Sequence, residues 1–378
     1  MSNQSEIPLH ANRTVRSSLA ALILAASLTC VGDAGAQPVG LVAGFFEKGV
    51  EARLKAPLSK TDLFDGAALR VVLCGTGSPM PDPARAKACT AVIVKGRVYL
   101  VDVGPGAVNS LQLMGFPLDR IAGVFLTHYH SDHIGDLGEL RMQTWVAGRA
   151  APLPVHGPEG VERVVGGFNA AYGLDDDYRT LHHGEAYMPH AAAQLAAQGF
   201  TAPEAGERVV YRDADVTITA FRVNHDPIKP AVGYRFDAGG RSVVVSGDTG
   251  PSANLVKESR GADLLVHEAL SARMVGLINQ ASKAAGLDRQ AKMVNDTLTY
   301  HTDPVDAARE ANAAGVGLLV YSHLAPGLPQ PALEKLFVDG VAAVRDPKSW
   351  AVGFDGMRID LPFAGGAPVQ SKVPMLGR

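Results

Sequence analysis

The feature that most constrains the fold is a cluster of metal-binding side chains placed directly after an apolar run, residues 121–126. The seven residues that follow are Thr127-His128-Tyr129-His130-Ser131-Asp132-His133. An apolar run that stops at such a cluster predicts a strand feeding a loop. Alternate residues at a strand end face one way, so His128 and His130 can share one ion while Asp132 and His133 point at a second. Neutral imidazoles and carboxylates are ligands that zinc prefers.

Three later strand-like runs repeat this pattern, each with a ligand-type residue just beyond its end. Residues 221–223 precede His225, residues 243–245 precede Asp248, and residues 318–321 precede His323. A lone histidine at a strand end is usually just a hydrogen-bonded polar residue. Several ligands delivered from strand ends onto one sheet edge instead predict a rigid metal site.

The order of predicted elements is strands first and then strands alternating with helices. The strands are predicted at 68–74, 90–94, 98–103, 121–126, 209–211, 216–223, 232–236, 242–246, 264–266 and 317–321. The helices are predicted at 38–56, 109–114, 136–150, 159–172, 269–286 and 304–314. With 47% hydrophobic residues and no internal linker, residues 67–363 are expected to form one domain.

The motif His128-x-His130-x-Asp132-His133, with the three later ligands, resembles the metallo-β-lactamase superfamily. The run Gly75-Thr76-Gly77-Ser78-Pro79 with Arg85, together with His267-Glu268-Ala269, resembles its ribonuclease Z and arylsulfatase-like branch. The resemblance covers about residues 67–330. It implies an α/β (α+β) fold, a four-layer αββα sandwich of two mostly antiparallel or mixed sheets packed face to face with helices outside.

The resemblance also implies two divalent metal ions as cofactors. Zinc is the expected metal, although manganese and iron suit the same ligands. By resemblance His128, His130 and His225 hold the first ion, Asp132, His133 and His323 hold the second, and Asp248 bridges both.

Two catalytic residues are expected beside the metal ligands. Asp132 orients the attacking water and His267 protonates the leaving group, although a buried, hydrogen-bonded role for His267 is equally open. Asp102 and His301 are expected to support the ligands. The other histidines considered are assigned to the surface or a lid: His156, His182, His183 and His190.

The N-terminus predicts a cleavable signal peptide over residues 1–36. Arg13 and Arg16 precede an apolar stretch from Leu19 to about Val31, and Ala34-Gly35-Ala36 offers a cleavage site. The stretch is shorter than the ~20 residues of a spanning helix, so no stable membrane span is expected. The alternative is an uncleaved anchor. A periplasmic or secreted location follows from the predicted signal.

Four further segments carry predictions. Cys74 and Cys89 form either a disulfide or two buried thiols. Residues 37–66 form an N-terminal helical segment that packs on the domain or on a partner subunit, and a homodimer is expected. Residues 174–205 form an insertion or lid, and residues 364–378 form a loose polar tail.

The expected function is an exported hydrolase of a sulfate or phosphate ester, arylsulfatase- or phosphodiesterase-like, acting on a small anionic substrate. A ribonuclease Z-like endonuclease is disfavoured, because an exported enzyme does not meet tRNA precursors. The net charge is −3, and residues 158–200 carry only Arg163 and Arg179 as cations, so no nucleic-acid partner is expected. A lactonase or β-lactamase-type enzyme and a non-catalytic metal-binding protein remain alternatives.

Overall fold

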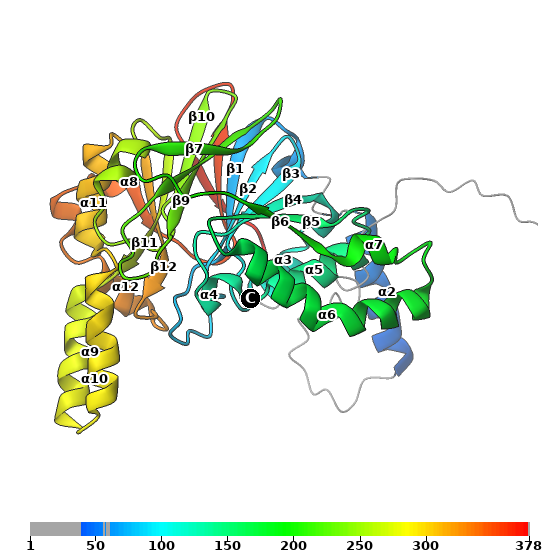
Figure 1. Cartoon of the computed structure of the whole chain (residues 1–378), viewed down its shortest axis with the longest axis horizontal. Helices are drawn as coiled ribbons and strands as arrows, with labels where there is room; N and C mark the ends of the chain where they lie inside the picture. Colours follow the sequence, from blue (N-terminus) through cyan, green and yellow to red (C-terminus); the bar gives the residue numbers. More distant parts are fainter. Residues whose placement is uncertain (1–38, 56, 58–60, 377–378) are drawn as a thin grey trace, which may run out of the picture.

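Two β-sheets packed face to face form the centre of the molecule, and helices cover their outer faces (Figure 1). The computed structural model describes residues 39–55, 57 and 61–376. This four-layer arrangement confirms the predicted αββα sandwich. Both sheets are mixed, with antiparallel and parallel pairs.

The first sheet has the strand order β15-β14-β1-β2-β3-β4-β5-β6. Its strands are β1 (Ala68–Gly75), β2 (Cys89–Val94), β3 (Arg97–Val101), β4 (Ile121–Phe125), β5 (Leu153–Gly157), β6 (Leu195–Gly199), β14 (Met357–Pro362) and β15 (Val369–Lys372). Every residue of β1 and β2 is buried. Both faces of this part of the sheet are therefore covered, which explains its nearly continuous apolar sequence.

The second sheet has the order β13-β12-β11-β10-β9-β8-β7. Its strands are β7 (Glu207–Arg212), β8 (Thr217–Arg222), β9 (Val232–Ala238), β10 (Arg241–Val245), β11 (Leu264–Leu270), β12 (Leu318–Ala325) and β13 (Trp350–Val352). The pairs from β10 to β13 are parallel. Side chains of both sheets, among them Val71, Phe125 and Val243, interdigitate in a buried layer between them.

Helices make the outer layers. They are α2 (Val39–Lys55), α3 (Ala107–Met114), α4 (Ser131–Ile134), α5 (Leu137–Val146), α6 (Val161–His183), α7 (His190–Ala193), α8 (Ala253–Glu258), α9 (Ala272–Ala284), α10 (Asp288–Asp296), α11 (Pro304–Ala313) and α12 (Pro331–Phe337). Apolar residues of α3, α5 and α6 pack on the first sheet, and those of α8, α11 and α12 pack on the second. Helices α9 and α10 project from the body as a hairpin (Figure 1).

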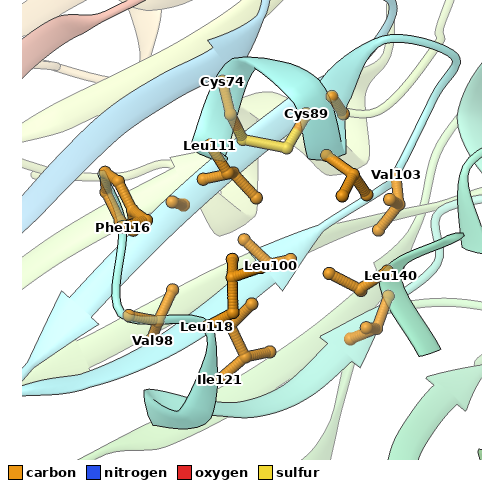
Figure 2. Packing of buried hydrophobic residues seen from close by; sticks show 14 of the residues in the cluster. Cys74, Cys89, Val98, Leu100, Val103, Leu111, Phe116, Leu118, Ile121 and Leu140 are labelled. Carbon is orange, nitrogen blue, oxygen red and sulfur yellow. A yellow bond between two sulfur atoms is a disulfide. The ribbon is translucent and has the colours of Figure 1, made fainter. Parts of the chain in front are cut away.

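Cys74 and Cys89 form a disulfide, which decides between the two alternatives that the sequence left open. Both residues are buried, at the end of β1 and the start of β2. Figure 2 shows the bridge within an apolar cluster that includes Leu100 and Leu111. The covalent bond therefore closes the base of the loop 76–88, which lies next to the site described below.

The structure corrects two segment predictions. Within 174–205, α6 continues to His183 and β6 pairs in parallel with β5, so this stretch completes the edge of a sheet instead of standing apart as an insertion. The tail after residue 363 contains β15, which pairs with β14, and Val373 and Met375 are buried in the core. The tail was predicted as loose because its apolar residues are too far apart in sequence to show a strand pattern.

The N-terminal predictions are only partly covered by the described residues. Helix α2 confirms the helix predicted over 38–56, and Phe45 and Phe46 are 50% and 41% exposed on it. The signal peptide, residues 1–36, lies outside the described residues, and the homodimer stays a prediction. Within the part of the chain that is described, no helix is long and apolar enough to cross a membrane.

Candidate metal centre

The histidine cluster lies where β4 ends. The loop after Phe125 carries His128 and His130, and the short helix α4 carries Asp132 and His133. His128 is fully buried, and Asp132 and His133 are 6% and 1% exposed. Gly104 allows this packing, because a Cβ atom there would lie 2.0 Å from the carbonyl oxygen of Asp132.

Strand ends of the second sheet bring the remaining ligands to the same place. One group joins His128, His130, His225 and Asp248, and a second joins Asp132, His133 and His323. Within each group the candidate ligand atoms all lie within 4.8 Å of one another. The structure therefore brings together all seven side chains that the sequence singled out as metal ligands.

Asp248 lies between the two groups. Its Oδ2 atom is 3.8 Å from Nε2 of His128 and 3.3 Å from Nε2 of His133, which belong to different groups. The same oxygen is 3.5 Å from Nε2 of His323. A carboxylate in this position can touch ions held by both groups, as the resemblance implies for a bridging ligand.

The donor set fits divalent metal ions. Buried ligand atoms without a hydrogen bond are Nε2 of His133, Nε2 of His225, Oδ1 of Asp248 and Nδ1 of His323. Burying a polar atom without a hydrogen-bond partner costs about 1–3 kcal/mol. Four such atoms close together therefore indicate that a bound group completes their contacts. Imidazole and carboxylate donors together suit zinc, manganese or iron, and the donor set does not choose among them.

The protonation states of the first group also suit metal binding. Burial lowers the pKa of His128 well below its ordinary value, and burial lowers the pKa of His130 and of His225 as well. Neutral imidazoles keep the lone pair that a metal needs. In the second group burial alone would lower the pKa of His133, but the Asp248 and Asp102 carboxylates outweigh it and raise that pKa.

Asp102 orients His133, as predicted. Its Oδ2 atom lies 2.8 Å from Nδ1 of His133, and its carboxylate also accepts hydrogen bonds from the backbone N–H and hydroxyl of Thr127. The left-handed backbone of Asp102, with φ at 58°, aims the side chain at both partners. The contact leaves Nε2 of His133 free to face the ligand group.

The Gly75–Pro79 motif fixes the loop that borders the site. Thr76 donates its N–H and its hydroxyl to Asp355, and Arg85 donates to Thr76 and to the carbonyl of Gly353. The N–H of Leu324, next to His323, donates to the carbonyl of Thr76. This motif therefore ties the first sheet to the strand that delivers His323, and its role is structural.

The structure does not place His267 with the metal ligands. His267 is fully buried, Nδ1 lies 2.5 Å from the carbonyl oxygen of Glu268, and Nε2 lies 3.3 Å from Glu310. Successive residues of a strand face opposite sides, so His267 points toward the outer helices when Glu268 points toward the site. The geometry favours the buried, hydrogen-bonded alternative over a proton donor.

His301 takes the position that was expected of His267. It forms a group with Asp248 and His323, and its ring stacks on His323 with centroids 5.7 Å apart. Nδ1 of His301 lies 3.1 Å from Oε2 of Glu268. Burial alone would lower the pKa of His301, but Glu268 outweighs it and raises that pKa to about 9. The role of Glu268 was not predicted from the sequence, although the alternation of residues along the strand 264–270 indicates which side chains share a face.

Two sheets with two ligand groups at one shared edge define a metal-dependent hydrolase of the αββα class. The family model described as a beta-lactamase superfamily domain matches residues 97–324. The chain is 37% identical over 263 residues to a protein named ribonuclease Z from Mycobacterium bovis, covering 69% of this chain and 87% of that protein. It is 34% identical over 296 residues to a ribonuclease Z of Mycolicibacterium gilvum, covering 78% and 96%. The chain belongs to the metallo-β-lactamase superfamily, in its ribonuclease Z branch.

Solved structures agree on the fold. A metallo-beta-lactamase fold protein of Bacillus subtilis aligns with a TM-score of 0.55 and 21% identity, covering 78% of this chain and 99% of that chain. The short form of human tRNase Z aligns with a TM-score of 0.54 and 21% identity, covering 78% and 100%.

The comparisons overturn two predictions. The expectation of an arylsulfatase-like hydrolase of small esters is wrong, because the relatives with 34–37% identity are named ribonuclease Z. The expectation of a small anionic ester as substrate, with no nucleic-acid partner, fails for the same reason.

Proposed function

We propose that this protein is a metal-dependent endoribonuclease that hydrolyses a phosphodiester bond in structured RNA. The names of the relatives support the substrate class, and their similarity to this chain covers 87% or more of two of them. The structural observation that carries the proposal is the Glu268–His301 pair, which faces the two ligand groups. An RNA leaving group is an alkoxide, which departs much more readily when it receives a proton.

The seven predicted ligands are assigned the roles that their grouping supports. His128, His130 and His225 would hold one ion, Asp132, His133 and His323 would hold the other, and Asp248 would be shared between them. When bound, the two ions supply a hydroxide at neutral pH and offset charge on the phosphoryl oxygens.

The chain itself supplies the positioning and the proton. The Oδ2 atom of Asp132 lies 3.1 Å from Nε2 of His323, and its second oxygen is assigned to orient the attacking water. Glu268 is fixed by the backbone N–H of Thr302 at 2.9 Å, and it holds His301 by Nδ1. The Nε2–H of His301 then delivers the proton to the leaving oxygen.

Exposed cations on the α9–α10 hairpin support an RNA substrate. The hairpin leaves β11 just after Glu268 and returns to the site at His301, so both of its ends lie at the site (Figure 1). Lys283 and Arg289 are exposed near its tip and form no ion pair with any described residue. Thirteen helical residues span about 20 Å, so these cations can contact phosphates several nucleotides from the reacting bond.

A precursor tRNA serves as the structured RNA for a direct test in vitro, because the branch resemblance points to that class of substrate. The metal-loaded protein is expected to cut a precursor transcript at one position, and Asp248→Ala is expected to abolish cleavage. A metal-loaded, folded protein that leaves both this transcript and a panel of other structured RNAs intact would remove the proposal.

We further propose that the protein acts outside the cytoplasm. The predicted signal peptide supports this location, and so does the buried Cys74–Cys89 disulfide, since such bonds are rare in the cytosol. Fractionation of cells that express the full chain tests the proposal. Recovery of the uncleaved protein with cytoplasmic markers would contradict it.

A further inference from the structure

Tyr300 lies at the border of the metal-ligand groups. Its backbone carbonyl accepts a hydrogen bond from Nδ1 of His225 at 3.0 Å. Its ring centroid is 5.1 Å from that of His225, edge to face, and 4.8 Å from that of His301. One residue therefore touches both a metal-binding histidine and the histidine that carries the proton.

The side chain of Tyr300 is partly exposed, and its hydroxyl makes no hydrogen bond to any residue that the structure describes. The hydroxyl of Tyr129, in contrast to that of Tyr300, donates a hydrogen bond to the carbonyl of Pro158 at 2.5 Å, and the Tyr129 ring packs beside Gly160.

We propose that the Tyr300 ring stacks on the base of a nucleotide adjacent to the reacting phosphate. The inference rests on the proposed RNA substrate and adds a residue that selects nucleotides at that site. Unpaired RNA bases are commonly recognised by stacking on aromatic side chains. A partly exposed aromatic ring beside the ligand groups offers a surface for such a base.

Two chromogenic phosphodiesters isolate the contribution of the base. Thymidine 5′-(p-nitrophenyl phosphate) and methyl p-nitrophenyl phosphate share the leaving group, and only the first carries a nucleoside. The ratio of their kcat/KM values measures the preference for a nucleoside. Tyr300→Ala is expected to lower this ratio about tenfold, and Tyr300→Phe, which keeps the ring, is expected to leave it within about twofold. Tyr178→Ala, which removes a 62% exposed tyrosine from α6, is the matched control and should not change the ratio.

Three outcomes would overturn the stacking role. In the first, Tyr300→Ala lowers both kcat/KM values equally, which indicates only support of His225. In the second, Tyr300→Phe loses as much as Tyr300→Ala, which assigns the effect to the hydroxyl. In the third, the wild-type protein shows no nucleoside preference.

Binding of thymidine 5′-monophosphate, measured by calorimetry, separates this inference from the proposed function. If neither diester nor RNA is hydrolysed, the proposed function fails. Weaker binding to Tyr300→Ala than to the wild type and to Tyr300→Phe would still support stacking. Equal binding to all three proteins would overturn it.

Discussion

The Nδ1 atom of His301 lies 3.1 Å from the Oε2 atom of Glu268, although the whole α9–α10 hairpin separates the two residues in sequence. The hairpin closes on itself, since Asn279 donates to the carbonyl of Ala291 at 2.7 Å. This contact holds α9 against α10, and the hairpin so closed keeps Glu268 next to His301.

Removing the proton donor should matter only when the leaving group needs a proton. We expect His301→Gln to lower kcat for RNA by about 10²–10⁴-fold and to change hydrolysis of bis(p-nitrophenyl) phosphate much less. The buried His267→Gln variant is the comparison, and it should lower thermal stability without favouring one substrate. Steady-state kinetics on both substrates measures this, and equal losses for His301→Gln on both would refute the proton transfer.

Asp102→Asn should weaken metal binding while keeping the fold, because asparagine tolerates the left-handed backbone at this position. The change removes the charge that orients Nδ1 of His133. We expect a loss of about 10–100-fold in metal affinity or activity. The metal content is measured after dialysis against increasing concentrations of a chelator. If the variant and the wild type lose half of their metal at the same chelator concentration, Asp102 does not support His133.

Reversing the two unpaired hairpin charges should affect only long substrates. Lys283→Glu combined with Arg289→Glu is expected to raise KM for RNA severalfold. The double variant should also reduce the slope of the logarithm of the RNA-binding constant against the logarithm of the salt concentration by about 2. Hydrolysis of bis(p-nitrophenyl) phosphate should not change. Arg163→Glu on α6 is the control, and an equal effect of that variant would show that the hairpin makes no specific contact.

Loss of the disulfide should lower stability without rearranging the metal ligands. Cys74 and Cys89 are separated by 15 residues, and closing a loop of that length contributes about 3 kcal/mol. Reduction of the wild-type protein and the Cys74→Ala, Cys89→Ala double variant should both lose roughly this free energy of unfolding. Denaturant titration measures it, and unchanged midpoints would mean that core packing alone fixes the loop.

His156 should make the protein sensitive to mild acid. The expectation that His156 lies at the surface or in a lid is wrong, because it is buried within β5. It stacks on Phe125 with ring centroids 4.5 Å apart, and burial lowers its pKa to about 4. The unfolded chain takes up the proton near pH 6.5, so stability falls as the pH drops from 6.5 to 4 and is unaffected above that window. The cost at pH 4 is about 3 kcal/mol. His156→Gln should flatten the pH dependence of the unfolding free energy, whereas the exposed control His183→Gln should not.

The strand ends and the ligand residues could be predicted because both depend on local sequence. Apolar β-branched runs such as 243–245 are buried strands in the structure, and the predicted ligands lie near or just beyond the ends of such strands. The strands of the tail could not be found in this way. Val369 to Lys372 are exposed, so only pairing with β14 makes them a strand.

The sequence by itself determined the seven candidate metal ligands, because ligand chemistry and the strand-then-loop pattern are local properties. The tertiary structure alone decided which buried histidine faces those ligands. His267 and His301 are both histidines beside acidic residues, and composition cannot rank them. Their difference arises when β11 pairs with β12, because that pairing fixes which face of the strand meets the site, and the returning hairpin then brings His301 to Glu268.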